Sequence, residues 1–437
     1  MPQQTSQSDA AYGPRQFALS GRAKAWFGLL VIAAFCLGYF LPIGRKAMIQ
    51  QHIDGPWFRQ SLIDDILAPW LAAAPTDSGF LRSALDRQWR PADRQTATLV
   101  SQGRLLFVLA TGWEVTGEKA YRDAVRRGAE FFIEHFPDRQ CGGWVWSVRP
   151  DGTVVDDYKS AYGHAFAIFG LAHAGRVTGE KRFLDAAIAC WADMKKHLRY
   201  DDGGFKPQTN RDFSRVRGAN TQNPMMHLFE ALLALHAATG SHAVFTDAGD
   251  LAEFIFGRLY QADGGWLPEM YDRSWKPLPD DAGGFVDLGH QFEWAFLLSQ
   301  AVRQGLPERY LAVGRRLLDY GMDHAYDARA GGIWARGDYA GRVTGRSKGW
   351  WQQTEHLRAV MRYAADHGRE DLWPAFARSL ETVKARFLDA DYGGWYGSAG
   401  TAGRPPARGG AYKGSVWKVG YHSAGMYREA LRLTGQL

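Results

Sequence analysis

Long stretches of the chain are apolar on nearly every side at helical spacing, a pattern typical of buried helices. Two examples are residues 103–117 (GRLLFVLATGWEVTG) and 163–179 (GHAFAIFGLAHAGRVTG). Each is followed by a stretch that is apolar on one face only, such as residues 121–136 (YRDAVRRGAEFFIEHF) and 182–198 (RFLDAAIACWADMKKHL). The pattern predicts helix pairs in which one member is buried and the other has a face in solvent.

Two short marks recur with these pairs. A turn of the form Asp-x-Gly-aromatic repeats at steps of 63, 61, 61, 67 and 62 residues, at Gly79, Gly142, Gly203, Gly264, Gly331 and Gly393. A glycine placed to cap a helix C-terminus follows each buried stretch, at Gly117, Gly179, Gly240, Gly305, Gly368 and Gly435.

Six repeats of one inner and one outer helix predict an all-α fold, an (α/α)6 barrel over residues 46–437. An open solenoid is the alternative, because stacked helix pairs also bury a continuous core. Closure is favoured by the count of six and by the lack of polar repeats at the two ends.

Residues 24–45 are predicted to form a single transmembrane anchor, after a polar tail at 1–23. The 20 residues from 25 to 44 carry no charge, which is about the length that crosses a hydrocarbon core. A cleaved signal peptide and a buried core helix are the alternatives. We therefore expect a membrane protein whose barrel lies on the cytoplasmic or the periplasmic side.

Composition excludes several classes of protein. Apolar residues make up 46% and charged residues 22%, so the chain is not disordered, and a mean hydropathy of −0.33 argues against many membrane spans. Three cysteines are too few for a disulfide framework or a four-thiolate zinc site. The net charge of +6 includes no basic run, so we expect no nucleic acid partner. The sequence leaves open whether the protein forms a homodimer.

Polar residues stand where the buried helices begin, although buried positions are normally apolar. Closing the ring would bring these entrances together around one cavity. Thirteen residues before the capping glycines lie Arg104, His227, Glu355 and His422, and fifteen before them lie Gln102, His164, His290 and Gln353.

Three clusters carry candidate chemistry. His290 and Glu293 are three residues apart, so they share a helix face and the carboxylate could orient the imidazole. Asn223 precedes His227, with Glu230 one turn later, and residues 417–422 (WKVGYH) open the last inner helix. No HExxH pattern is present, so we expect no metal. Arg104 could hold a substrate hydroxyl or acidic group, or form a structural salt bridge.

Six segments together resemble the N-acylglucosamine 2-epimerase family, which includes mannose isomerases and cellobiose 2-epimerases. The resemblance covers about residues 55–435, through QGRLLFVLA, DYKSAYGHAFAIFGLA, NPMMHLFEALLAL, GHQFEWAFLL, KGWWQQTEHLRAV and WKVGYH. It implies an (α/α)6 barrel in which His290 and His422 are the catalytic acid–base pair. It also implies that the substrate is bound by Arg104, Asn223, His227, Glu293, Tyr162, Trp351 and Glu355.

The chain departs from the family at two positions near the last cluster. Val419 replaces a glycine common before the Tyr-His pair, and Gly425 stands where many relatives have arginine. These departures, with the predicted anchor, leave the substrate less certain than the reaction class.

The predicted function is a sugar 2-epimerase or aldose–ketose isomerase acting on an open-chain reducing sugar. Imidazole has the pKa needed to move a proton at C2 through an enediolate, so no cofactor is expected. The substrate would be of N-acylglucosamine or N-acylmannosamine, mannose or cellobiose type. The alternatives are a polysaccharide hydrolase or lyase using carboxylates such as Glu230, Glu293 and Glu355, and an inactive saccharide-binding relative.

Overall fold

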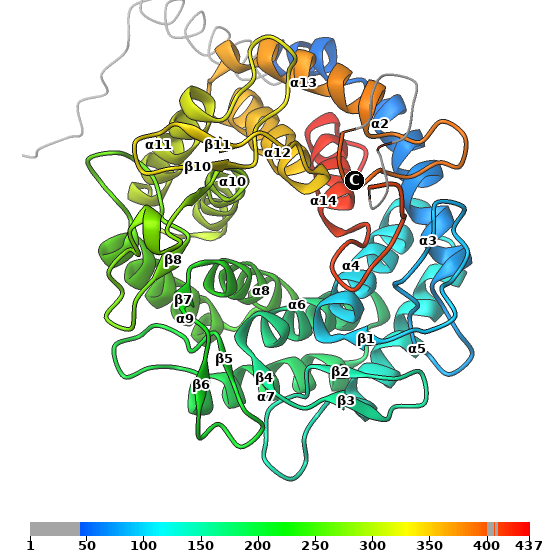
Figure 1. The fold of residues 1–437 in the computed structure, drawn as a ribbon. Coiled ribbons are helices and arrows are strands. Elements are labelled where there is room, and N and C mark those ends of the chain that lie inside the picture. The colour runs from blue at the N-terminus through cyan, green and yellow to red at the C-terminus, as the bar shows by residue number, and fades with distance from the viewer. Residues whose placement is uncertain (1–43, 400–405, 407–409) are drawn as a thin grey trace, which may run out of the picture. The chain divides into compact units, whose positions relative to one another are not determined.

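Six helices surround the barrel axis in the described part of the chain. The computed structural model describes residues 44–399, 406 and 410–437, of which those from His52 onward belong to one compact unit. Figure 1 shows the inner ring, formed by α4 (Leu99–Thr116), α6 (Ala161–Thr178), α8 (Asn223–Thr239), α10 (Leu288–Gln304), α12 (Trp350–Asp366) and α14 (Tyr421–Thr434).

Capping residues set the limits of these inner helices. The Thr98 and Ser160 side chains accept backbone N–H bonds at the starts of α4 and α6, and left-handed glycines end five of the six described inner helices. In α12 the cap is His367, and Gly368 follows it with a φ of 70°. The predicted C-caps are thus confirmed at five positions, with a one-residue shift at the sixth.

The outer helices cover the inner ring. They are α5 (Lys119–His135), α7 (Lys181–His197), α9 (His242–Phe254) with a π-helical turn (Ile255–Leu259), α11 (Arg309–His324) and α13 (Trp373–Arg386). Short 3-10 turns lie at Asp280–Ala282 and Glu370–Leu372.

The remaining outer position is filled from the other end of the unit. There α2 (Gly55–Leu62), a π-helical turn (Ile63–Leu67) and α3 (Ala68–Ala73) run on without a break. Because α14 contacts α2, α4 and α12, the ring is closed, and the predicted (α/α)6 barrel is confirmed over the open solenoid.

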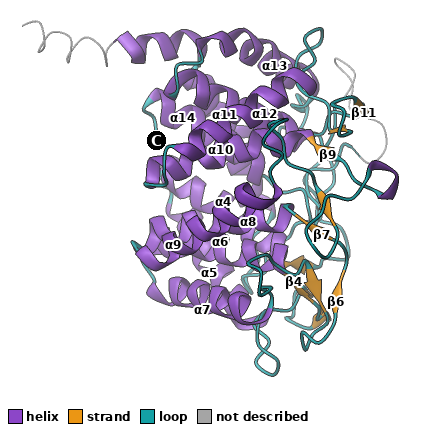
Figure 2. Ribbon diagram, turned by 90° about the vertical axis from the view of Figure 1, so that its left-hand side faces the viewer, coloured by secondary structure: helices purple, strands orange, loops and turns teal. Residues whose placement is uncertain are grey.

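Short antiparallel strands gather at one end of the barrel (Figure 2). They form the sheets β1-β2-β3, β4-β5-β6, β7-β8 and β11-β10-β9. β1, β4, β7 and β9 each lead into an inner helix, so this end holds the inner-helix N-termini. The strands are β1 (Ala97–Thr98), β2 (Ser147–Val148), β3 (Val154–Asp156), β4 (Lys159–Ser160), β5 (Gln208–Thr209), β6 (Val216–Arg217), β7 (Asn220–Thr221), β8 (Met270–Tyr271), β9 (Val286–Asp287), β10 (Arg336–Gly337) and β11 (Val343–Gly345).

A repeated hydrogen bond fastens four of the six glycine-aromatic turns to an inner helix. Gln102, His164, Gln291 and Gln353 each accept the backbone N–H of a turn residue, at 3.1, 2.9, 3.0 and 2.8 Å. The expectation that all the polar entrance residues face one cavity is therefore wrong for Gln102, His164 and Gln353, which hold the turns in place. In α10 this task belongs to Gln291, which frees His290 for the cavity.

The predicted membrane localisation is corrected by the structure. In residues 44–399, 406 and 410–437, no helix combines the length and the apolar composition needed to cross a bilayer. The apolar helices of the unit, such as α6, instead bury their side chains within the barrel. The predicted anchor, 24–45, lies outside the described residues except at its last two positions, and the domain boundaries placed there stay a prediction.

Candidate active site

A cavity of about 250 Å³ opens among the inner-helix N-termini. Seven of the nine predicted site residues line it, and Glu293 and Glu355, both fully buried, lie against lining imidazoles. The lining residues are Arg104, Tyr162, Asn223, His227, Glu269, Phe285, Asp287, His290, Trp350, Trp351, Trp417 and His422.

His290, on the first turn of α10, is held by a carboxylate from another segment. Its Nδ1 lies 2.8 Å from Glu269 Oε2, which leaves Nε2 to face the cavity. Burial lowers the pKa of His290, but the carboxylates of Asp287 and Glu269 outweigh it and raise the pKa to about 10. At neutral pH His290 is therefore a positively charged acid.

The orientation of Glu269 is fixed by a small network. Gln222 Nε2 donates to Glu269 Oε2 at 2.7 Å, and Thr221 Oγ1 donates to Oε1 at 2.8 Å. Trp294 Nε1 donates to Gln222 Oε1 at 2.7 Å. Because an indole N–H can only donate, this bond determines which way the Gln222 amide points. The His290 proton on Nδ1 is consequently directed at the carboxylate.

His422, on the first turn of α14, has the opposite protonation state. Its Nδ1 lies 2.9 Å from Glu355 Oε1, so its Nε2 also faces the cavity. Burial, with the positive charge of Arg104, lowers the pKa of His422 well below its usual range. Trp351 lies between the two histidines, with its ring 5.0 Å from the His290 ring and 5.6 Å from the His422 ring.

His227 is a third neutral imidazole at this cavity. Its Nδ1 lies 3.3 Å from Glu230 Oε2, and Tyr421 Oη donates to the same carboxylate. Burial lowers the pKa of His227 to about 4. Because the neutral ring keeps its proton on Nδ1, facing the Glu230 carboxylate, the other ring nitrogen can accept a hydrogen bond from a substrate hydroxyl.

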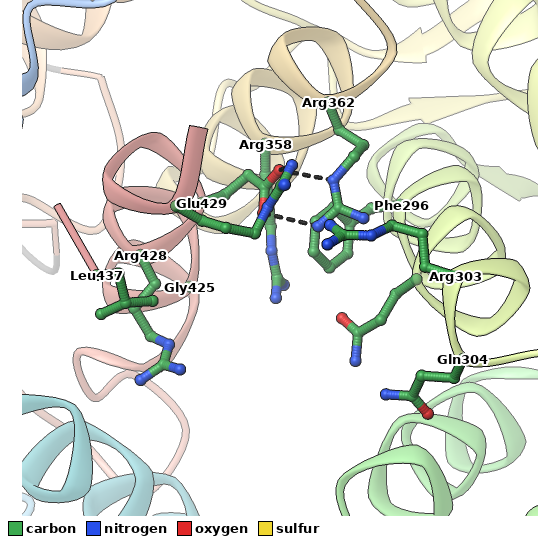
Figure 3. Close-up of a pocket in the computed structure, with 11 residues that line it drawn as sticks. Phe296, Arg303, Gln304, Arg358, Arg362, Gly425, Arg428, Glu429 and Leu437 are labelled. Atoms are coloured by element: carbon green, nitrogen blue, oxygen red, sulfur yellow. Dashed lines mark hydrogen bonds and ion pairs between the residues drawn. The ribbon is translucent and has the colours of Figure 1, made fainter. Parts of the chain in front are cut away.

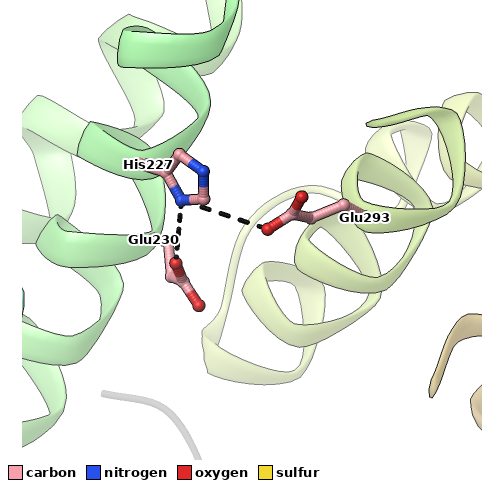
Figure 4. A group of neighbouring side chains, drawn as sticks. All are labelled: His227, Glu230 and Glu293. Carbon is pink, nitrogen blue, oxygen red and sulfur yellow. Dashed lines mark hydrogen bonds and ion pairs between the residues drawn. The ribbon is translucent and has the colours of Figure 1, made fainter. Parts of the chain in front are cut away.

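The spacing of Glu293 and His290 predicted that the carboxylate orients the imidazole, but the structure does not show this contact. Glu293 faces His227 and Glu230 on the neighbouring inner helix α8 (Figure 4), with Oε1 4.0 Å from His227 Nδ1. Neither carboxyl oxygen has a hydrogen-bond partner among the described residues. Burial and the nearby Glu355 raise the pKa of Glu293 well above its ordinary value, which favours its protonated form.

Arg104 and Asn223 present polar groups to the cavity. Arg104 donates to the Trp417 carbonyl at 2.8 Å and to Tyr162 Oη at 2.7 Å. Arg104 Nε and Asn223 Oδ1 are buried and lack partners within the described part of the chain. The structural salt bridge considered for Arg104 is not formed with any described residue.

Glu269 and Arg358 are not among the residues that the sequence singles out. Glu269 follows the fourth glycine-aromatic turn by three residues, within the otherwise apolar stretch LPEMY. That isolated carboxylate was a usable signal, because a charged residue in an apolar run needs a partner. Its pairing with His290 depends on the packing of the loop before α8 and could not be found from spacing.

Two groups of three described side chains could hold a metal ion. They share Glu293 and are His227, Glu230 and Glu293, and Glu293, Glu355 and His422. A ligating carboxyl must lose its proton, and the raised pKa of Glu293 opposes that loss.

We therefore expect turnover to survive dialysis against EDTA. The check is the rate before and after dialysis, with total metal measured on the same sample. A loss of rate that Mn²⁺ or Zn²⁺ restores would assign an ion to one of these groups.

The amino-acid sequence matches the model of one known protein family. The model of the N-acylglucosamine 2-epimerase (GlcNAc 2-epimerase) family matches residues 79–422. The chain belongs to the N-acylglucosamine 2-epimerase family. It is therefore a carbohydrate epimerase or isomerase, and the hydrolase, lyase and inactive-binder alternatives are set aside.

Individual members of the family are distant in sequence. A cellobiose 2-epimerase of Bacteroides fragilis is 23% identical over 85% of this chain and 97% of its own length. A mannose-6-phosphate isomerase of Rhizobium meliloti is 28% identical over 70% of this chain and 76% of its own. The solved cellobiose 2-epimerase of Spirochaeta thermophila has a TM-score of 0.80 at 23% identity, covering 89% and 98% of the two chains. That structure supports the fold.

Proposed function

We propose that this protein interconverts C2 epimers, or an aldose and its ketose, by proton transfer between His422, His290 and an open-chain sugar. The observation that supports the proposal is the pair of imidazoles beside Trp351. Each is held at Nδ1 by a carboxylate, and their pKa values are shifted in opposite directions. We assign the activity to residues 46–437.

His422 is the base in the first step. Its neutral Nε2 takes the proton from C2 of the aldose, and the C–H electrons form the C1–C2 double bond of an enediolate. Glu355 stabilises the resulting imidazolium through its 2.9 Å contact with Nδ1. Because its pKa is lowered, His422 is unprotonated at neutral pH and its Nε2 is free to take a proton.

The enediolate oxygen needs donors that are already in place. Arg104 offers a charged Nε–H that is buried and unpartnered among the described residues, whereas neutral His227 can accept a bond from a neighbouring hydroxyl. Asn223 can bind a neighbouring hydroxyl. These groups strengthen their bonds as negative charge develops, which lowers the barrier to removing the proton.

His290 completes the reaction as the acid. Proton delivery to the opposite face of C2 gives the epimer. Delivery to C1, with loss of the proton on O2, gives the ketose. The positive charge that Glu269 and Asp287 maintain on His290 keeps this proton available across the neutral range.

The size of the cavity favours a single sugar unit at the reacting end. Its 250 Å³ is below the roughly 300–1,000 Å³ of common small-molecule sites. Trp417 lines this cavity and is 50% exposed, so a second ring could stack on it beyond the reducing unit. We therefore propose mannose, N-acylmannosamine or N-acylglucosamine, and the reducing end of cellobiose as the substrates to test.

A proton exchanged through the two histidines should partly equilibrate with solvent. Each of these sugars incubated with the protein in D₂O should gain deuterium, at C2 of an epimer or at C1 of a ketose. NMR of the products reads both the position of the label and the identity of the product. Turnover without any label would contradict the proposal and indicate hydride transfer.

Borohydride-reduced sugars provide the matched control. They keep every hydroxyl but lack the carbonyl that makes the C2 proton acidic. No label should enter them, and a reaction on a reduced sugar would show that the substrate is not the open-chain aldehyde.

A further inference from the structure

A second cavity of about 290 Å³ lies where the inner helices end, at the opposite end of the barrel axis from the strands. Figure 3 shows arginine side chains entering it from α12 and α14, with Gln304 across from them on α10. It is lined by Phe296, Gln300, Arg303, Gln304, Arg358, Arg362, Gly425, Arg428, Glu429, Arg432 and Leu437.

Two of the five lining arginines already have carboxylate partners. Arg362 binds both oxygens of Glu429, at 2.6 and 2.7 Å. Arg432 binds the same carboxylate at 2.6 Å and Asp366 at 2.5 Å. Arg362 and Arg432 are therefore fully paired. The other three arginines have fewer or longer contacts with carboxylates.

Arg358 is only weakly paired. Its guanidinium lies 3.7 Å above the Phe296 ring and makes one long contact of 3.4 Å with Glu355. Its Nε is buried without a hydrogen-bond partner in the described ranges. A Cβ added at Gly425 would lie 3.2 Å from Arg358 Cζ, so the glycine leaves room for this side chain.

Arg303 and Arg428 are the other two. Among the residues that the structure describes, the carboxylate nearest to Arg303 is that of Asp366, at 3.7 Å. Arg428 contacts Glu114, but it shares that carboxylate with Arg176. Burial lowers the pKa of Arg428 to about 10, which is the expected effect when a buried cation lacks full compensation.

The cationic region extends beyond this cavity. A neighbouring cavity of about 280 Å³ shares Gln300, Gln304, Arg358 and Arg428 with it and adds Arg176. Arg358 and Arg428 therefore face both cavities and offer N–H donors on either side. Planar guanidinium groups arranged in this way match the geometry of a phosphate or sulfate group.

We infer that this end of the barrel is a binding site for a small oxyanion, held by Arg303, Arg358 and Arg428. The ligand is inorganic phosphate or the phosphoryl group of a small metabolite. The site is separate from the sugar cavity, since the two share none of their lining residues. Arg358 joins them through Glu355, so a bound anion would lie one side chain from the carboxylate that holds His422.

Calorimetric titration of the full chain with inorganic phosphate, in a buffer of monovalent anions, tests the site. We expect one saturable site, with Kd raised about 10-fold or more by Arg428→Gln, because hydrogen bonds to charged groups are worth that much. Arg303→Gln should have the same direction of effect, and its half-exposed side chain (48%) makes it the safer variant for folding. Glycerol 3-phosphate in a second titration distinguishes a phosphoryl ligand from free phosphate.

Two controls locate the binding. Arg127→Gln, on the exposed face of α5, and Arg104→Gln, in the sugar cavity, should both leave Kd unchanged. The inference is overturned if neither anion binds, if Arg104→Gln abolishes the binding, or if folded Arg303→Gln and Arg428→Gln bind like the unaltered protein.

Discussion

Replacing His422 by asparagine is expected to lower kcat by about 10²–10⁴-fold, the usual contribution of general acid–base catalysis. Asparagine keeps a polar group at the cavity but has no nitrogen that can take the C2 proton. Sugar binding should persist, because Arg104, Asn223 and His227 are untouched. Steady-state rates with a binding titration on the same sample measure the two effects separately.

His290→Asn should show a loss of the same order. Its defect lies in proton delivery, so the variant should still exchange the C2 proton of the substrate with D₂O more readily than it forms product. His242→Asn, on the exposed surface of α9, is the matched control and should turn over normally. Near-normal kcat in either cavity variant would refute the assigned pair.

The fold could be predicted because the sequence signals that repeat along the chain each depend on only a few neighbouring residues. A glycine that caps a helix and a glycine-aromatic turn depend on backbone conformation within a few residues, so they survive as sequence signals. The partner of the last inner helix could not be found in this way. The outer position beside α14 is filled by α2 and α3, from the start of the unit, and α14 contacts α2.

The sequence predicted that the site lies at the N-termini of the inner helices. It did not predict correctly which residues occupy equivalent positions in different helices. Counting back from the capping glycine placed His290 level with His164. α10 has 17 residues whereas α6 has 18, so the count is one residue out. Registered from the N-terminus, Gln291 is the true equivalent of His164, which explains why His290 is free to enter the cavity.

The carboxylates that hold the imidazoles were the least predictable part. Glu293 shares a helix with His290, yet the partner is Glu269 from the preceding loop. A side chain three residues away competes with every group that the tertiary structure brings near. The resulting pKa of His290 depends on Glu269 and Asp287 together, and only the folded arrangement determines it.

Glu269→Gln should therefore move the alkaline limb of the pH profile. His290 acts in its protonated form, so kcat/KM of the unaltered protein should stay level through neutral pH and fall near its pKa of about 10. Glutamine removes the charge but can still accept the Thr221 bond. The pKa of His290 then falls, and activity is lost at lower pH than before.

The size of this effect depends on where the rate is measured. At about pH 9 we expect kcat/KM to fall about 10-fold or more, because each unit by which the pKa falls below the working pH removes tenfold of the protonated form. At about pH 6 the two proteins should differ little. The acid limb should stay in place, since it reports His422, whose pKa is held well below its usual range by burial.

The charge of Glu269 can be separated from its shape by two further variants. Glu269→Asp keeps the carboxylate and should keep most of the alkaline activity, whereas Glu134→Gln, exposed on α5, should change neither limb. If Glu269→Gln lowered the rate equally at every pH, the carboxylate would be positioning the ring without setting its charge. If the acid limb moved instead, His290 would be the base and His422 the acid, and the direction of proton transfer would be reversed.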